Sequence, residues 1–145
     1  MKILFNRKID FITIKYESGS CVHIREEDQN DYVESDILCI SDKYISLERH
    51  RDLLDDELFW EATFSEGEFE PKFNKLCDLI LNLDDALVAG LDGPHVEITI
   101  YFSGGDIRIE RDIYGSLLVQ EFNELVEVLL EILPSDWVVP KFCEI

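Results

Sequence analysis

Two segments of this chain have the apolar spacing of an amphipathic α-helix, and they limit the folds that it can adopt. In residues 122–132, apolar side chains recur every three or four positions, and Pro134 stands where such a helix would end. Residues 73–83 repeat the pattern, with Pro71 in the first turn, where proline is tolerated. The predicted apolar faces are Phe73, Leu76, Ile80 and Leu83 in one helix, and Leu118, Phe122, Leu125, Leu129 and Ile132 in the other.

Much of the remaining chain alternates polar and apolar residues, which is typical of β-strands. Residues 11–24 and 96–109 each predict a β-hairpin, in which β-branched and aromatic residues flank a glycine-containing turn. Residues 48–57 fit either a short helix or a loop. Further strands are predicted at residues 36–40, 44–47 and 58–64. The pattern therefore predicts an α+β fold, in which one or more antiparallel sheets pack against two amphipathic helices.

The two hairpins resemble each other in sequence, and so do the two helices. Aligning residues 11–24 with residues 96–109 matches Tyr16 with Tyr101. The chain can thus be divided into two hairpin–helix repeats with a β-rich insertion in the first, at residues 9–83 and 94–133. Hairpins and amphipathic helices also resemble one another by physics alone, so duplication stays one of two explanations. In both cases the length predicts a single domain, residues 1–145, with its own core.

The chain is strongly acidic. It contains 32 Asp and Glu against 13 Lys and Arg, for a formal net charge of -19. Self-repulsion at this charge opposes the compact state, whereas a negative field speeds the encounter with a positive partner. We therefore expect a basic protein as partner. The same charge disfavours direct binding to nucleic acid or to an anionic membrane.

The acid is concentrated in residues 26–36, in residues 52–71 and on the outer face of the last helix. Neither of the first two stretches contains Lys or Arg. A solvated surface explains any one stretch, but the three together favour a binding surface, in which charges steer the encounter and a few aromatics add affinity. Trp60 either belongs to this surface or packs in the core, since it alternates in phase with Leu58 and Ala62. The candidate partner-binding residues are Glu26, Glu27, Asp28, Asp31, Asp52, Asp55, Asp56, Glu57, Trp60, Glu61, Glu66, Glu68 and Glu70.

The sequence contains no HExxH, GxGxxG, GxSxG or calcium-loop motif. The histidines form no HxxxH or HExxH pattern, and they are His23, His50 and His95. The cysteines form no CxxC pair, and they are Cys21, Cys39, Cys77 and Cys143. Their apolar surroundings indicate reduced thiols of a cytoplasmic protein. We therefore predict no catalytic residue, no metal and no cofactor, and the chain is not expected to be an enzyme.

As a type, a small acidic α+β domain with acidic stretches at residues 26–36 and 52–70, the chain resembles the immunity proteins of bacterial polymorphic-toxin and contact-dependent growth-inhibition systems. That resemblance implies a protein that neutralises a cognate toxin domain, most often a basic nuclease. It would do so by covering the active site or the substrate-binding surface of the toxin. The alternative is an acidic nucleic-acid mimic or regulatory adaptor that binds a host DNA- or RNA-binding protein. The sequence leaves the oligomeric state open.

Overall fold

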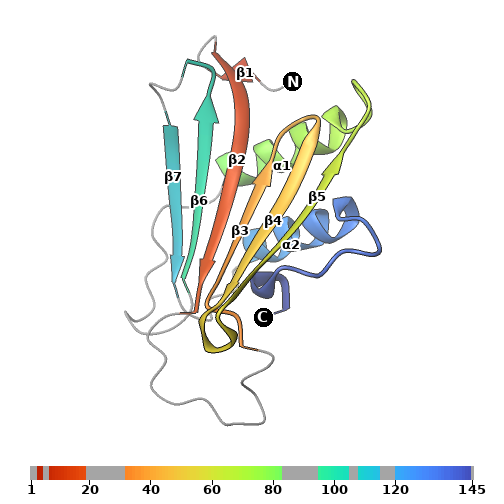
Figure 1. Cartoon of the computed structure of the whole chain (residues 1–145). Helices are drawn as coiled ribbons and strands as arrows, with labels where there is room; N and C mark the ends of the chain where they lie inside the picture. The colour runs from red at the N-terminus through yellow and green to blue at the C-terminus, as the bar shows by residue number, and fades with distance from the viewer. Residues whose placement is uncertain are drawn as a thin grey trace.

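The computed structural model describes residues 3–4, 7–18, 32–82, 95–104, 108–114 and 120–144, and it confirms the α+β class (Figure 1). The strands are β1 (Ile3–Leu4), β2 (Arg7–Glu17), β3 (Ser35–Ile40), β4 (Tyr44–Arg51), β5 (Asp56–Thr63), β6 (His95–Phe102) and β7 (Arg108–Tyr114). The helices are α1 (Glu70–Leu81) and α2 (Gln120–Ile132), together with the short 3-10 helices η2 (Asp52–Leu54) and η3 (Lys141–Glu144).

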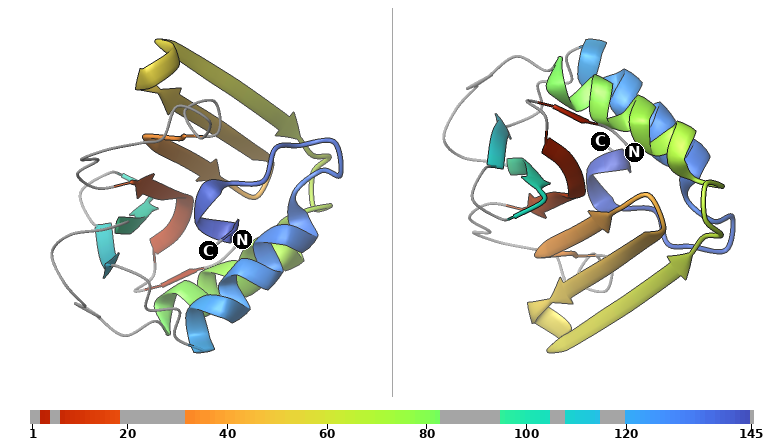
Figure 2. Two further views of the ribbon diagram at one scale, coloured as in Figure 1. Left: turned by 90° about the horizontal axis from the view of Figure 1, so that it is seen from below. Right: turned by 90° about the horizontal axis from the view of Figure 1, so that it is seen from above.

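The described strands form an antiparallel sheet in the order β5-β4-β3-β2-β6-β7, and β1 pairs with β2. Helices α1 and α2 lie side by side against one face of this curved sheet (Figures 1 and 2). No described helix lies on the opposite side of the sheet, which we call the open face (Figure 2). Among the described residues, no helix is both long enough and apolar enough to cross a membrane.

The core lies between the sheet and the two helices. Phe73, Leu76, Cys77 and Ile80 are buried in α1, and Leu125, Val128, Leu129 and Ile132 are buried in α2. Both sets have the same three-four spacing, which confirms the predicted apolar faces within the described residues. Leu83 and Leu118 lie outside that part of the chain, and so does the side chain of Phe122. From the sheet, every second residue of the central strands enters the core, as with Ile12 and Ile14.

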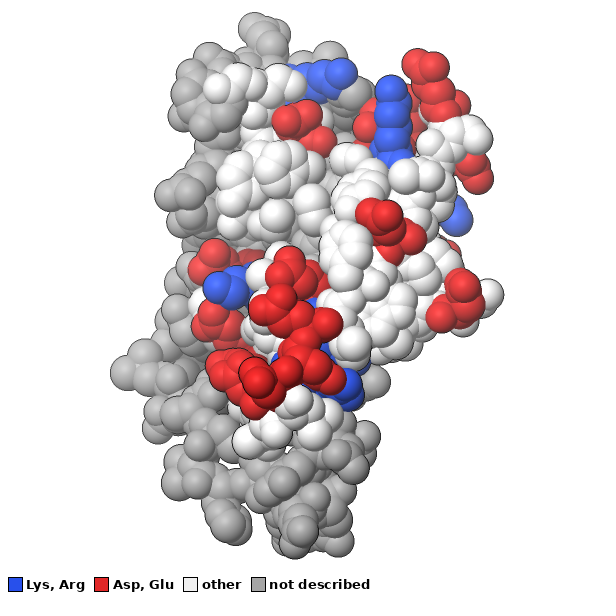
Figure 3. All heavy atoms as spheres, viewed as in Figure 1, with Lys and Arg blue, Asp and Glu red and all other residues white. Residues whose placement is uncertain are grey.

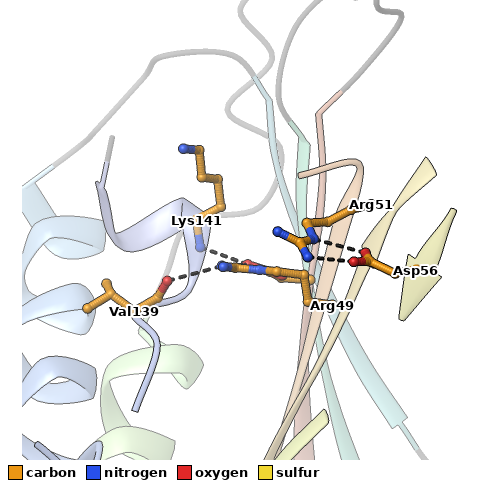
Figure 4. A network of polar contacts seen from close by, with 6 residues as sticks. Arg49, Arg51, Asp56, Val139 and Lys141 are labelled. Atoms are coloured by element: carbon orange, nitrogen blue, oxygen red, sulfur yellow. Dashed lines mark hydrogen bonds and ion pairs between the residues drawn. The ribbon is translucent and has the colours of Figure 1, made fainter. Parts of the chain in front are cut away.

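Residues 139–142, near the C-terminus, are held against the sheet by hydrogen bonds to a buried ion pair (Figure 4). Asp36 on β3 is fully buried, and both of its carboxylate oxygens accept hydrogen bonds of 2.8 Å from Arg49 on β4. Asp36 also accepts a 2.8 Å bond from the Lys141 backbone amide, and Arg49 donates to the Val139 carbonyl at 3.1 Å. These bonds hold the segment in place where Phe142, at 0% exposure, fills the core.

Some predicted strands are confirmed and others are corrected. Strands β3 and β4 contain the strands predicted at residues 36–40 and 44–47, and β5 covers all but the last residue of the strand predicted at 58–64. Strand β6 pairs with β7 as the hairpin predicted for residues 96–109. Gly104 in its turn has a φ of 98°, which favours glycine. Residues 48–57 are mostly strand, since β4 runs to Arg51 and β5 begins at Asp56, with only η2 between them. The prediction of a helix or a loop is therefore wrong for residues 48–51 and 56–57.

The hairpin predicted for residues 11–24 is not the pairing that β2 makes. Strand β3 occupies one edge of β2 and β6 occupies the other, so neither edge is left for a second hairpin arm along the paired residues. Residues 21–24, the expected second arm, lie outside the described residues. Of the residues aligned in the proposed repeat, Tyr16 is buried in the core, whereas Tyr101 stacks on Phe11 at 4.4 Å between ring centroids. The aligned tyrosines therefore occupy different environments.

Candidate functional site

Strand register gathers acidic residues on the open face. One row across the sheet runs Glu57, His50, Ser35, Glu17 and His95 from β5 to β6. The next row contains Phe59, Glu48, Ile37, Lys15 and Glu97. Alternate residues of a strand share one face, and antiparallel pairing places them opposite one another, so glutamates far apart in sequence become neighbours.

We call the end of the open face at Glu17, Glu34, Glu48, Asp52, Asp55, Asp56 and Glu57 the acidic end. Figure 3 shows acidic side chains gathered there, over the ends of β2 and β4. A depression of about 430 Å³ is lined by Lys15, Glu17, Ser18, Glu34, Ser35, Ile37 and His50. A second, of about 210 Å³, is lined by His50, Asp52, Asp55, Asp56 and Glu57. The two depressions adjoin at His50.

Several of these carboxylates already have cationic neighbours. The Lys15 Nζ lies 3.0 Å from Glu17, and the hydrogen bond to Glu17 raises the pKa of Lys15, with smaller contributions from the charges of Glu17 and Glu97. Arg51 donates two hydrogen bonds to Asp56, and these hold the pKa of Asp56 below its usual range. These pairs neutralise only part of the acidic end.

Two carboxyl groups at the acidic end, those of Glu34 and Asp52, interact with each other. A hydrogen bond with the Asp52 carboxyl raises the pKa of Glu34, with loss of solvent and charge repulsion acting in the same direction. Within the described part of the chain, Glu34, Asp52 and Asp55 form no ion pair with Lys, Arg or His. Repulsion between the two carboxylates opposes folding at neutral pH and favours the arrival of a cation.

Replacing Asp52 by asparagine is expected to stabilise the protein at pH 7. A raised folded-state pKa for Glu34 favours folding at low pH, and that contribution is lost as the pH rises through the folded pKa. Asp52→Asn removes the repulsion, so the melting temperature should rise by roughly 1–2 °C at pH 7 and by less at about pH 3. The measurement is thermal unfolding at both pH values. Glu66→Gln is the control for net charge, and equal effects of the two variants would contradict the prediction.

His50 bridges two glutamates from neighbouring strands. Its Nε2 lies 3.0 Å from Glu48 and its Nδ1 lies 3.3 Å from Glu57. Each of these three residues has one potential metal-ligating atom, and the three atoms all lie within 4.8 Å of one another, which is close enough to hold a metal ion. The contacts of the imidazole with the two carboxylates account for the same geometry, so we assign no metal to it.

The structure brings only some of the predicted site residues together. Asp52, Asp55, Asp56 and Glu57 lie at the acidic end, whereas Glu61 lies farther along β5 and accepts a bond from the Tyr44 hydroxyl. Trp60 is half-buried, packs against the core and has the Arg49 guanidinium 6.0 Å from its ring centroid. Three more predicted binding residues follow β5, at the end of that strand away from the acidic end, and they are Glu66, Glu68 and Glu70. The remaining four lie outside the described residues, and they are Glu26, Glu27, Asp28 and Asp31.

Sequence reasoning missed Glu17, Glu48 and Glu97, because each stands alone in sequence and strand pairing brings them together. Their only sequence signal is the alternation that assigns them to the polar face of a strand. The last residue of the acidic stretch 26–36 does not belong to an acidic surface. Asp36 is no surface residue, because Arg49 from the next strand neutralises it inside the protein.

Comparison with models of known protein families and with curated proteins finds no match to this chain. The functional argument therefore rests on the site alone.

Proposed function

We propose that this chain is an immunity protein, which binds a cognate bacterial toxin domain through the acidic end and blocks its active site or substrate-binding surface. The observation that carries the proposal is the convergence of carboxylates from β2, η2 and the start of β5 on one end of the open face. Part of that charge has no cation among the described residues, and the Glu34–Asp52 pair repels itself. A basic toxin, most simply a nuclease, would supply the missing cations.

The arrangement supports binding rather than catalysis. Four carboxylates and His50 line the smaller depression, and the lining of the larger one is mostly polar, whereas small-molecule sites are mostly apolar with a few placed polar groups. Phe59, 56% exposed on β5, supplies an aromatic contact near this charge. Charges that steer and an aromatic that anchors are the combination used by protein inhibitors. We place the protein in the cytoplasm, where it would meet its toxin.

A survival assay tests the proposal. The C-terminal domain encoded by the reading frame immediately upstream is expressed in a susceptible bacterium, with and without this protein. We expect killing that this protein reverses and that an unrelated acidic protein does not. A toxin that kills equally in its presence, or an upstream domain without toxicity, would contradict the proposal and favour the nucleic-acid mimic.

A further inference from the structure

Strand β5 is at the edge of the sheet, and its backbone has a defined direction. The Phe64 amide donates to the Lys43 carbonyl at 2.8 Å, which fixes the alternation of the β4–β5 ladder. Leu58, Trp60 and Ala62 therefore direct their backbone groups toward β4. The residues between them direct theirs outward, and they are Glu57, Phe59, Glu61 and Thr63. No other segment among the described residues pairs with that outer edge.

The outward residues are also exposed on the open face. Glu57, Phe59, Glu61 and Thr63 are all exposed, and β5 contains no Lys, Arg, Pro or Gly along its length. Natural edge strands are commonly guarded by lysine, proline or a bulge. In β5 the only such protection is negative charge, which disfavours pairing with an acidic strand and does not oppose a basic one.

The same charges disfavour a second copy of this chain at the edge. An antiparallel pairing of β5 with β5, centred on Phe59, would place Glu57 opposite Glu61 on both sides. Like charges directly opposite each other destabilise a strand pair. Lys or Arg at the corresponding positions of a foreign strand would instead form opposite-charge pairs with both glutamates and contact the ring of Phe59.

We propose that the outer edge of β5 accepts an extended, basic segment of the partner as an added strand. Backbone hydrogen bonds to Glu57, Phe59, Glu61 and Thr63 would hold the segment, and its Lys or Arg side chains would lie over the two glutamates. The choice of a basic partner rests on the proposed function. The edge leads from the acidic end, because η2 directly precedes β5, so one partner can occupy both.

The test uses nuclear magnetic resonance of the ¹⁵N-labelled full chain and an acetylated octapeptide of alternating Lys and Thr. At millimolar peptide, we expect amide shifts with a period of two along β5. The amides of Glu57, Phe59, Glu61 and Thr63 should move more than those of Leu58, Trp60 and Ala62. No shift, or shifts without this alternation, would overturn the proposal.

Two controls separate strand pairing from simple charge attraction. A peptide of the same charge, N-methylated at the residues that face β5, cannot donate and should bind about tenfold more weakly. Phe59→Pro removes an outward N–H that β4 does not use, so the fold should persist while peptide binding falls. Equal binding of the N-methylated peptide would overturn the proposal, whatever the behaviour of the proline variant.

This experiment and the survival assay fail in different ways. Alternating shifts along β5 together with an upstream domain that is not neutralised would reject the immunity function and keep the docking edge. Neutralisation that Phe59→Pro leaves intact, with peptide shifts lacking the alternation, would reject the docking edge and keep the immunity function.

Discussion

Asp36→Ala should destabilise the protein by about 3–5 kcal/mol, as expected when one partner of a buried ion pair is removed. Asp36 is fully buried and accepts three hydrogen bonds of 2.8 Å, two from the Arg49 guanidinium and one from the Lys141 amide. The alanine would leave the guanidinium, only 11% exposed, without its carboxylate. It would also loosen the segment that delivers Phe142 to the core.

Urea denaturation monitored by tryptophan fluorescence measures this loss, and Trp60, next to Arg49, offers a local probe. Glu66→Ala removes an exposed carboxylate and is the matched control, with an expected change within about 0.5 kcal/mol. A double-mutant cycle with Arg49→Ala should show strong coupling, because either single change breaks the pair. Additive losses would indicate that the two side chains act independently.

The helices were predictable because their signal is local. The burial of Phe73 and Ile80 in α1, and of Leu125 and Ile132 in α2, follows from three-four spacing within one segment. Strand order is not local. Whether β2 pairs with residues 21–24 or with β3 and β6 depends on contacts far apart in sequence, which alternation alone does not encode.

In the candidate site, too, residues adjacent in sequence could be predicted together and residues joined by strand pairing could not. Asp52, Asp55, Asp56 and Glu57 were predictable together, because they are adjacent in sequence and lie around one turn. Glu17, Glu48 and Glu97 come together only through the register of four strands. Asp36 was assigned to an acidic surface because its partner, Arg49, lies 13 residues away in the next strand. A run of like charge therefore predicts a surface only where no partner strand supplies a cation.

Reversing charge at the acidic end is expected to abolish neutralisation of the toxin. The variant combines Glu48→Lys, Asp52→Lys and Glu57→Lys, which replace carboxylates by cations in the path of a basic partner. Asp55 is kept because its φ is 50°, and Asp56 is kept because Arg51 binds it. Affinity for the toxin domain identified in the survival assay should fall by about a hundredfold or more.

The matched control reverses Glu124, Glu127 and Glu131, which are exposed on α2, on the side of the sheet away from the acidic end. Both triple variants change the net charge equally, so they separate a local surface from the overall field. If the acidic end binds, only its variant loses high affinity, and its remaining binding depends less on salt. If both variants weaken binding equally, the overall charge of -19 attracts the partner without a defined surface. The proposed site would then be wrong, even if the protein still neutralised a toxin.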